Sequence, residues 1–207
     1  MTPPTVPLRL PVPQVLDGPV VRLEPLTREA LPELFAAIGR PEVFAGGYGG
    51  GPAGYRDTAP AFAAWAETYY PWRTGLPFAI RLSSGPEEGR LVGTSSLAEF
   101  EPATERAHLG WTAYDPAVWG TAVNPAAKRL LLGLAFESGF GRVKIQADAR
   151  NERSRAAIAK LGATFEGITR RDARRADGSW RDAAVFSVIV DDWPRVRDGL
   201  DARVRKG

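Results

Sequence analysis

The chain has 207 residues, of which 44% are hydrophobic and 25% are charged, and its net charge is +3. These values fit one globular domain that is large enough to bury a core. The chain contains no cysteine and a single histidine, which excludes disulfides, thiolate catalysis and multi-histidine or cysteine-ligated metal sites. No apolar run reaches the roughly 18 residues of a membrane span, and no signal-peptide pattern precedes the domain, so we expect a cytoplasmic protein.

The N-terminal part of the chain changes character near residue 17. Residues 1–16 are rich in proline and show no hydrophobic period, which predicts an extended or disordered arm followed by one domain over residues 17–207. Alternating residues over 20–26 predict a first strand. Thr27 is expected to cap a short helix whose buried face includes Leu31 and Leu34.

The segment Gly46–Gly54 contains too much glycine for a regular helix or strand. A phosphate cradle is one interpretation, but the segment lacks the Lys-Ser/Thr ending of a P-loop and does not fit G-x-G-x-x-G. We favour a mobile loop on the substrate side, and a plain connector is the alternative.

The central part of the chain predicts one helix and three strands. The helix runs from about Thr58 to Tyr70, and its aromatic face is typical of a core. Strands are expected over residues 77–82, 90–97 and 105–114, with a turn between the first two. Aromatic residues of this region that could instead line a pocket are Trp65, Tyr69, Tyr70 and Trp72.

A clean amphipathic helix follows from about Pro125 to Ser138. Asn124 is a favoured N-cap residue, and Pro125 falls at the first helical position, where its missing N–H costs nothing. The small residues before it leave backbone N–H groups free at a helix N-terminus, which favours anion binding, although an ordinary capped helix explains the same pattern.

The C-terminal part predicts a strand over residues 142–148 and a helix that Asn151 caps and that ends at Gly162. A hairpin over residues 163–171 and 181–190 and a helix from about 193 to 204 complete the chain. This order of elements predicts a single α+β domain in which helices cover the faces of a mixed sheet.

Three segments resemble motifs of one enzyme family. They are Ala107–Thr112, Trp119–Lys128, and Asp148–Ser154 together with Lys160–Ala163. In this order and spacing they resemble the GNAT N-acetyltransferases of the Rim-type branch (RimJ/RimL-like), over roughly residues 18–193. The resemblance implies a central, mostly antiparallel sheet that splays at the cofactor site, and acetyl-CoA as co-substrate with no metal.

The resemblance also implies the cofactor contacts. Backbone amides of the window 117–122 would hold the diphosphate, although Ala117 departs from the Arg or Gln of the motif. Asn151 would bind the pantetheine arm and Ser154 would lie near the thioester sulfur, while helix capping explains both residues as well. Lys128 and Arg153 would either reach the CoA phosphates or stand on a solvated face. The cofactor-binding residues expected in this way are Trp111, Thr112, Trp119, Gly120, Thr121, Ala122, Val123, Asn124, Asn151 and Ser154.

Two residues are the candidates for catalysis. His108 stands where relatives often carry a glutamate, and an imidazole could act as general base, although a lone histidine on a strand can also be structural. A backbone amide at Trp111–Thr112 would stabilise the oxyanion of the acetyl carbonyl. The position at which many family members carry an acid tyrosine holds Ile158, which leaves Ser154 as the candidate to protonate the thiolate.

These expectations combine into an acyl-CoA-dependent N-acyltransferase that moves an acetyl group to a primary amine of a small molecule or a protein N-terminus by direct attack. A non-catalytic acyl-CoA-binding or regulatory module is the alternative, and a nucleotide-binding protein that uses Gly46–Gly54 is a third hypothesis. The acceptor would lie near residues 44–73. Many arginines stand beside acidic residues, so no nucleic-acid partner is expected. No membrane partner is expected either. The sequence does not decide whether the protein forms a homodimer.

Overall fold

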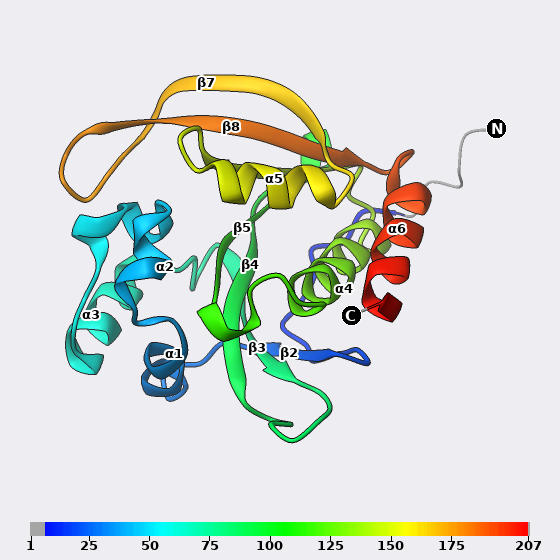
Figure 1. Ribbon diagram of the computed structural model, residues 1–207. Helices are drawn as coiled ribbons and strands as arrows, with labels where there is room; N and C mark the ends of the chain where they lie inside the picture. The colour runs from blue at the N-terminus through cyan, green and yellow to red at the C-terminus, as the bar shows by residue number, and fades with distance from the viewer. Residues whose placement is uncertain (1–6, 207) are drawn as a thin grey trace.

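The computed structural model describes residues 7–206, which form one mixed sheet with helices packed against it (Figure 1). The sheet has eight strands in the order β1-β2-β3-β4-β5-β6-β8-β7. The strands are β1 (Leu16–Asp17), β2 (Val21–Pro25), β3 (Gly75–Leu82), β4 (Leu91–Glu101), β5 (Arg106–Tyr114), β6 (Arg142–Asp148), β7 (Thr164–Arg174) and β8 (Trp180–Ile189). The helices are α1 (Leu31–Ile38), α2 (Pro41–Ala45), α3 (Ala59–Tyr69), α4 (Val123–Glu137), α5 (Glu152–Lys160) and α6 (Trp193–Lys206). The predicted α+β fold with a mostly antiparallel sheet is confirmed.

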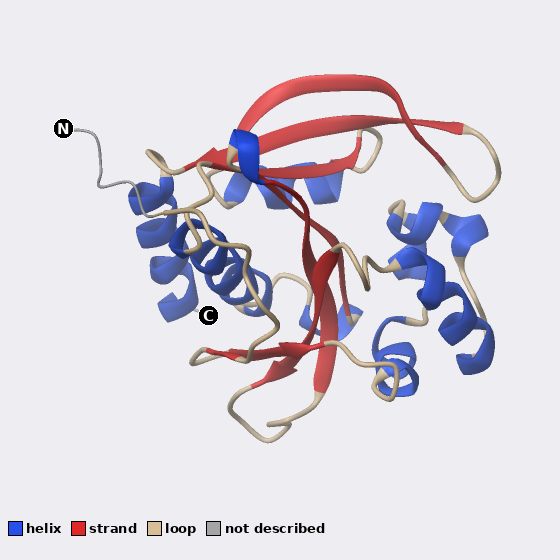
Figure 2. Cartoon of the chain, turned by 180° about the vertical axis from the view of Figure 1, so that it is seen from behind, coloured by secondary structure: helices blue, strands red, loops and turns tan. Residues whose placement is uncertain are grey.

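The sheet divides between β5 and β6. These two strands are the one parallel pair of neighbours among the described residues. Pairing between them runs from Arg106↔Arg142 to His108↔Lys144 and goes no further, although both strands continue. Every other neighbouring pair is antiparallel. The two halves of the sheet therefore run apart beyond His108, as Figure 2 shows from behind.

Two hydrophobic clusters hold the layers together. The larger one joins α4 and α6 to one face of the sheet through residues such as Leu131, Leu109 and Val188. The smaller one joins α1 and α3 to the opposite face through residues such as Leu34 and Phe62. Since α1–α3 and α4 pack on opposite faces, they flank the sheet on both sides of the place where it divides (Figure 1).

The start of α4 differs from the sequence prediction. The chain is already helical at Ala122, which precedes the first residue of the helix, so Asn124 lies inside the first turn and is not the N-cap. The N-cap position is Ala122, which has no side-chain cap, and the residue before it, Thr121, accepts from the Val123 N–H through its hydroxyl at 3.3 Å. Pro125 is tolerated two positions later than predicted because the first four N–H groups of a helix have no intrahelical partner.

The start of α1 also differs, because the helix begins at Leu31 and its N-cap position is Ala30, not Thr27. Thr27 instead begins a turn in which its carbonyl accepts from the Ala30 N–H. Two predicted caps are confirmed: the Thr58 hydroxyl accepts from Ala61 N–H before α3, and the Asn151 side chain accepts from Ser154 N–H before α5. Sequence reasoning missed β1 and α2 altogether.

The glycine-rich segment forms more structure than the sequence predicts. It contains two short 3₁₀ turns, Tyr48–Gly50 and Pro52–Gly54, after α2. The turns are possible because Gly47, Gly49 and Gly50 have positive φ angles, which glycine adopts without steric cost. Their N–H and C=O groups are used in turns, for example from Gly54 N–H to Gly51 C=O.

Of the predicted arm over residues 1–16, residues 1–6 lie outside the described residues. Residues 7–15 contain no helix or strand, and the Arg9 N–H donates to the Ser138 carbonyl at 2.9 Å. The division into an arm and a domain therefore stays a prediction. Within residues 7–206, no helix combines the length and apolar character that crossing a membrane requires.

Candidate active site

A cavity of about 600 Å³ opens where β5 and β6 part. Its walls come from β5, β6, the loop before α4, the start of α5 and the glycine-rich segment. The predicted cofactor and catalytic residues that line it are His108, Trp111, Thr112, Trp119, Gly120, Asn124, Asn151 and Ser154. Thr121, Ala122 and Val123 follow Gly120 along the chain but are not among its lining residues.

A β-bulge shapes the β5 wall of this cavity. The pairing with β4 shifts between Ser96↔Gly110 and Thr94↔Ala113, so that Trp111 and Thr112 both stand opposite one residue of β4. Trp111 has a φ of 50°, which is the left-handed conformation that marks such a kink. A bulge leaves its extra residue outside the regular ladder, which is where the resemblance predicts the amide for the acetyl carbonyl.

The bulge also decides which side chains face α4. The indole of Trp111 turns toward α3, where its Nε1 donates to the Tyr69 carbonyl at 3.0 Å. The next side chain, Thr112, turns to the opposite face and meets Lys128 of α4. In an unbroken strand these two residues would each point the other way, because side chains alternate.

Asp115 holds the loop before α4 in place through two hydrogen bonds. This residue is 3% exposed, its Oδ2 accepts from Arg90 at 2.6 Å, and its Oδ1 accepts from the Ala117 N–H. Ala117 therefore uses its amide inside the loop, while its methyl group offers no polar contact. Neither Arg90 nor Asp115 was predicted to act here, because no local motif links positions 25 residues apart.

The backbone of this loop is open at Gly120. This glycine has a φ of 80°, and a Cβ built on it would meet no atom within 4 Å. Next to it, the Trp119 indole donates to the Tyr114 carbonyl and carries the Arg153 guanidinium 3.7 Å above its ring. The loop thus offers open backbone at the N-terminal end of a helix, together with a nearby cation, which suits a phosphate group.

Asn151 already uses both ends of its side-chain amide within the chain. Its Oδ1 caps α5 by accepting from Ser154 N–H at 2.9 Å, and its Nδ2 donates to the Gly46 carbonyl. The capping interpretation of Asn151 is thus confirmed, and the residue also ties the glycine-rich segment to α5. Its contact with the pantetheine arm and the role of Ser154 at the sulfur stay predictions.

His108 lies at the last parallel pair of the sheet, where the cavity begins. Its side chain is buried, and neither ring nitrogen makes a well-aligned hydrogen bond with the described residues. Nδ1 is nevertheless 3.1 Å from Oε2 of Glu99, which also binds Lys144 at 2.8 Å. Burial lowers the pKa of His108, and the positive charge of Lys144 lowers it further, while Glu99 opposes both effects. The imidazole is therefore neutral at neutral pH, as a general base must be.

Glu99 was missed by sequence reasoning. It lies in a second irregularity of the β4–β5 pairing and has a φ of 50°, so its side chain leaves the regular alternation. Contact with His108 and Lys144 lowers its pKa to about 2, so it carries its negative charge throughout the working pH range. No sequence pattern marks this bulge.

Lys128 does not stand on a solvated face, which was one of its two sequence interpretations, while its contact with a CoA phosphate stays a prediction. It is 4% exposed and lines the cavity wall. Its ammonium donates to Thr112 Oγ1 at 2.7 Å and to Ser95 Oγ at 3.0 Å. Burial lowers its pKa to about 7.

The predicted acceptor side contributes fewer aromatic residues than the sequence allowed. Tyr69 lines the cavity together with Tyr48, while Trp65, Tyr70 and Trp72 belong to the core. The hydroxyls of Tyr48 and Tyr70 bond each other, and Tyr69 accepts from the Gly49 N–H at 3.3 Å. The glycine-rich segment therefore forms part of the cavity wall and is held there by tyrosines.

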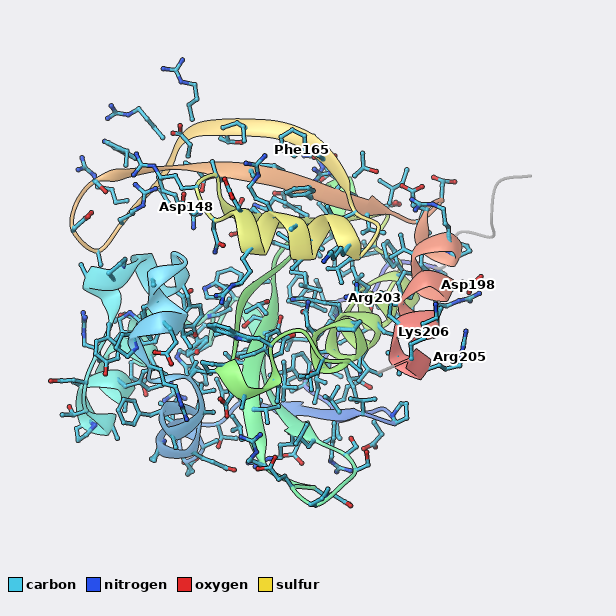
Figure 3. All side chains as sticks on the ribbon, viewed as in Figure 1. Asp148, Phe165, Asp198, Arg203, Arg205 and Lys206 are labelled. Atoms are coloured by element: carbon cyan, nitrogen blue, oxygen red, sulfur yellow. The ribbon has the colours of Figure 1, made fainter. Side chains whose placement is uncertain are left out.

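The far end of the cavity is polar and internally paired. Asp148, labelled in Figure 3, is the last residue of β6. It binds Arg175 at 2.6 Å, and Asp172 binds Arg181 at 2.7 Å. Among residues 7–206, no group of three or more acidic or histidine side chains is arranged to hold a metal ion.

Comparison with known proteins identifies the family. The acetyltransferase (GNAT) domain family matches residues 21–164, which is more than half of the chain. The chain belongs to the GNAT acetyltransferase family. GNAT acetyltransferases are acyl-CoA-dependent N-acyltransferases, and the cavity of this member coincides with the splayed strands and the loop before α4 that the resemblance predicted.

The chain is similar to individual acetyltransferases of this family. YdaF of Bacillus subtilis (strain 168), provisionally named a ribosomal N-acetyltransferase, is 32% identical over 108 residues, which cover 51% of this chain and 57% of YdaF. A structure from T. thermophilus, provisionally described as an acetyltransferase, has a TM-score of 0.83 at 35% identity and covers 95% of this chain and 100% of its own. RimJ of Mycobacterium smegmatis, solved with CoA-disulfide, shares the fold with a TM-score of 0.70 at 21% identity, over 92% of this chain and 93% of RimJ.

The residues of the cavity fit the acetyl-CoA that this family uses. Open backbone at Gly120 admits a phosphate group, and the N-terminus of α4 favours its negative charge. The sequence predicts that Trp119, Gly120 and Asn124 surround the diphosphate and that Trp111 and Thr112 lie at the acetyl end, and all five residues line the cavity.

Proposed function

We propose that this protein transfers the acetyl group of acetyl-CoA to a primary amine by direct attack. The observation that carries the proposal is the placement of a buried, neutral imidazole and an open helix N-terminus in one cavity, at the point where β5 and β6 part. The acceptor is a primary amine of a small molecule or of a protein N-terminus.

In this reaction the amine nitrogen attacks the acetyl carbonyl and the carbon–sulfur bond breaks. His108 takes the proton that the amine loses, through Nε2 or an intervening water, while Glu99 holds the other side of the ring. The backbone amide at the β5 bulge stabilises the negative charge that develops on the carbonyl oxygen. The departing thiolate of CoA receives a proton from Ser154 or from solvent.

The proposal is tested by measuring thiol release from acetyl-CoA with a panel of small primary amines and peptides that have free N-termini. We expect amine-dependent release together with the acetylated product by mass spectrometry. In His108→Ala we expect kcat/KM to fall by about 10²–10⁴-fold while acetyl-CoA affinity stays unchanged. Binding of acetyl-CoA without release on any amine would favour the non-catalytic acyl-CoA-binding module instead.

A further inference from the structure

The β5 bulge holds a bulky residue in a strained backbone conformation. Trp111 has a φ of 50°, which lies in the left-handed region that glycine adopts freely and a bulky residue seldom occupies. Such a conformation persists only where the surrounding contacts fix it. The contacts that hold this bulge therefore decide where its backbone amide points.

On the α3 side, the bulge is fixed through the indole of Trp111. Its Nε1 donates to the Tyr69 carbonyl at 3.0 Å. The indole also lies beside His108, with 5.2 Å between the two ring centroids. These contacts fix the side chain of Trp111, while the next residue, Thr112, faces the other side of the sheet and needs a separate partner there.

On the α4 side, Lys128 joins the bulge to the neighbouring strand. Its Nζ donates to Thr112 Oγ1 at 2.7 Å and to Ser95 Oγ of β4 at 3.0 Å. The two hydroxyls bond each other at 2.8 Å, and they reach the Gly110 carbonyl at 3.3 Å from Thr112 and 3.4 Å from Ser95. Since Gly110 and Thr112 flank Trp111, this network closes around the strained residue.

The ammonium also decides how the two hydroxyls are oriented. Each hydroxyl has one proton to donate and accepts through its oxygen. Because Lys128 donates to both oxygens, the protons of Ser95 and Thr112 are directed toward each other or toward the Gly110 carbonyl. The rotamer of Thr112 is therefore fixed by Lys128 as well as by β4.

This network contains a charge that no ion pair offsets. Lys128 is 4% exposed, and its hydrogen bonds within residues 7–206 go to hydroxyl groups only. Burial lowers its pKa to about 7, because an apolar environment destabilises the charged form. An unbranched apolar side chain would fill the same space without this cost. What a lysine adds at this position is its pair of bonds to the bulge and to β4.

We propose that Lys128 is a positioning residue, which holds the β5 bulge through Thr112 and Ser95 so that the backbone amide of the bulge faces the acetyl carbonyl. This proposal rests on the proposed function, in which that amide stabilises the charge on the carbonyl oxygen. Such a donor is effective only when it is already aimed at the place where the charge develops. A bulge that moves should therefore lower kcat and leave acetyl-CoA binding intact.

Two variants remove the same bond from its two ends. Lys128→Met keeps an unbranched side chain of similar length but loses the ammonium. Thr112→Val keeps the branched shape of the side chain and the charge of Lys128 but loses the hydroxyl. The matched control is Lys160→Met, which removes an exposed lysine of α5 outside the cavity.

We expect Lys128→Met and Thr112→Val each to lower kcat by about 10- to 100-fold and to bind acetyl-CoA within about twofold of the wild type. The rates are compared at about pH 7.5, where His108 is neutral. The double variant should be little slower than the slower single variant, because both substitutions break one shared contact. Lys160→Met should keep the wild-type kcat.

Two further measurements need no activity and separate positioning from general support of the fold. Hydrogen exchange at residues 110–113 should be faster in Lys128→Met and Thr112→Val, while exchange in β8 stays as in the wild type. Lys128→Met should melt at least about 2 °C higher than the wild type at neutral pH, because it removes a buried, unpaired charge. A lysine that only supported the fold would lower the melting temperature when replaced.

Wild-type exchange at residues 110–113 in Lys128→Met, wild-type kcat in both variants, or acetyl-CoA binding that falls as much as kcat would overturn the assignment. Thr112→Val decides the question if Lys128→Met does not fold. Absence of amine-dependent thiol release by the wild type would instead overturn the proposed function. The exchange measurement uses no acetyl-CoA, so the two failures are distinguishable.

Discussion

Oε2 of Glu99 lies 3.1 Å from Nδ1 of His108, the ring nitrogen that is not the one proposed to take the proton. Its carboxylate stays ionised, because contact with His108 and Lys144 lowers its pKa to about 2. The charge that His108 experiences from Glu99 is therefore constant with pH. Three residues from β4, β5 and β6 thus combine at the place where the sheet divides.

The first prediction concerns this charge. His108 has a pKa lowered from its usual value of 6.5, mainly by burial, so the acidic limb of the kcat/KM profile should lie below pH 6.5. Glu99→Gln removes a charge that raises this pKa, and the limb should then move to still lower pH. A pH–rate series on both proteins measures it, and a shift to higher pH would contradict the geometry.

The second prediction uses Gly110. A Cβ at this position would lie 3.0 Å from His108 Nε2, which is tighter than ordinary contact, so Gly110→Ala should displace the ring without removing it. We expect a lower kcat with unchanged acetyl-CoA affinity. Gly199→Ala is the control, because no atom lies within 4 Å of its Cβ position and the residue is in α6, where alanine stabilises by about 1 kcal/mol. If both variants kept the wild-type kcat, the position of His108 would not matter for catalysis.

The third prediction separates the two bonds of Asn151. Asn151→Asp keeps an oxygen that caps α5 but loses the N–H that binds the Gly46 carbonyl, whereas Asn151→Ala loses both. The unfolding free energy should fall by about 1 kcal/mol in Asn151→Ala and less in Asn151→Asp. Hydrogen exchange at residues 46–50 should rise in both variants. Unchanged exchange in both would show that the tether does not order this segment.

The fourth prediction concerns stability and pH at Lys128. The native pKa is about 7 and the ordinary value is 10.5, so the unfolded chain binds more protons between these values and wild-type stability rises with pH in that window. Lys128→Met has no ionisable group at this position, so its stability lacks this pH dependence. Chemical denaturation should therefore show the largest advantage of Lys128→Met below about pH 7, and the advantage should shrink toward about pH 10. A difference in unfolding free energy that does not change with pH would show that folding does not lower the pKa of Lys128.

Much of the fold could be predicted from local patterns. The apolar face of α4, the cap of α3 at Thr58 and the cap of α5 at Asn151 follow from side-chain chemistry within one turn of helix. Boundaries were less predictable: Asn124 is a good cap by residue type, but the helix begins earlier, at Val123, with Ala122 as its N-cap.

The site depends on features that no local pattern carries. Glu99 reaches His108 only because a bulge turns its side chain, and bulges leave no periodicity in the sequence. Lys128 is buried because Thr112 and Ser95 face it from two strands, and a lysine in an amphipathic helix is normally assigned to the solvent side. Asp115 and Arg90 are paired by folding across 25 residues.

The most direct test of the account is acetyl-CoA binding by Gly120→Ala compared with Gly178→Ala. Both glycines have φ near 80° and open space at the Cβ position, so the two variants carry similar backbone strain, but only Gly120 lines the cavity. Saturating acetyl-CoA should raise the melting temperature of the wild type and of Gly178→Ala by about 5 to 10 °C, and that of Gly120→Ala clearly less. Equal shifts in the two variants, or a larger shift of the wild type with ATP than with acetyl-CoA, would contradict a cofactor site at this loop.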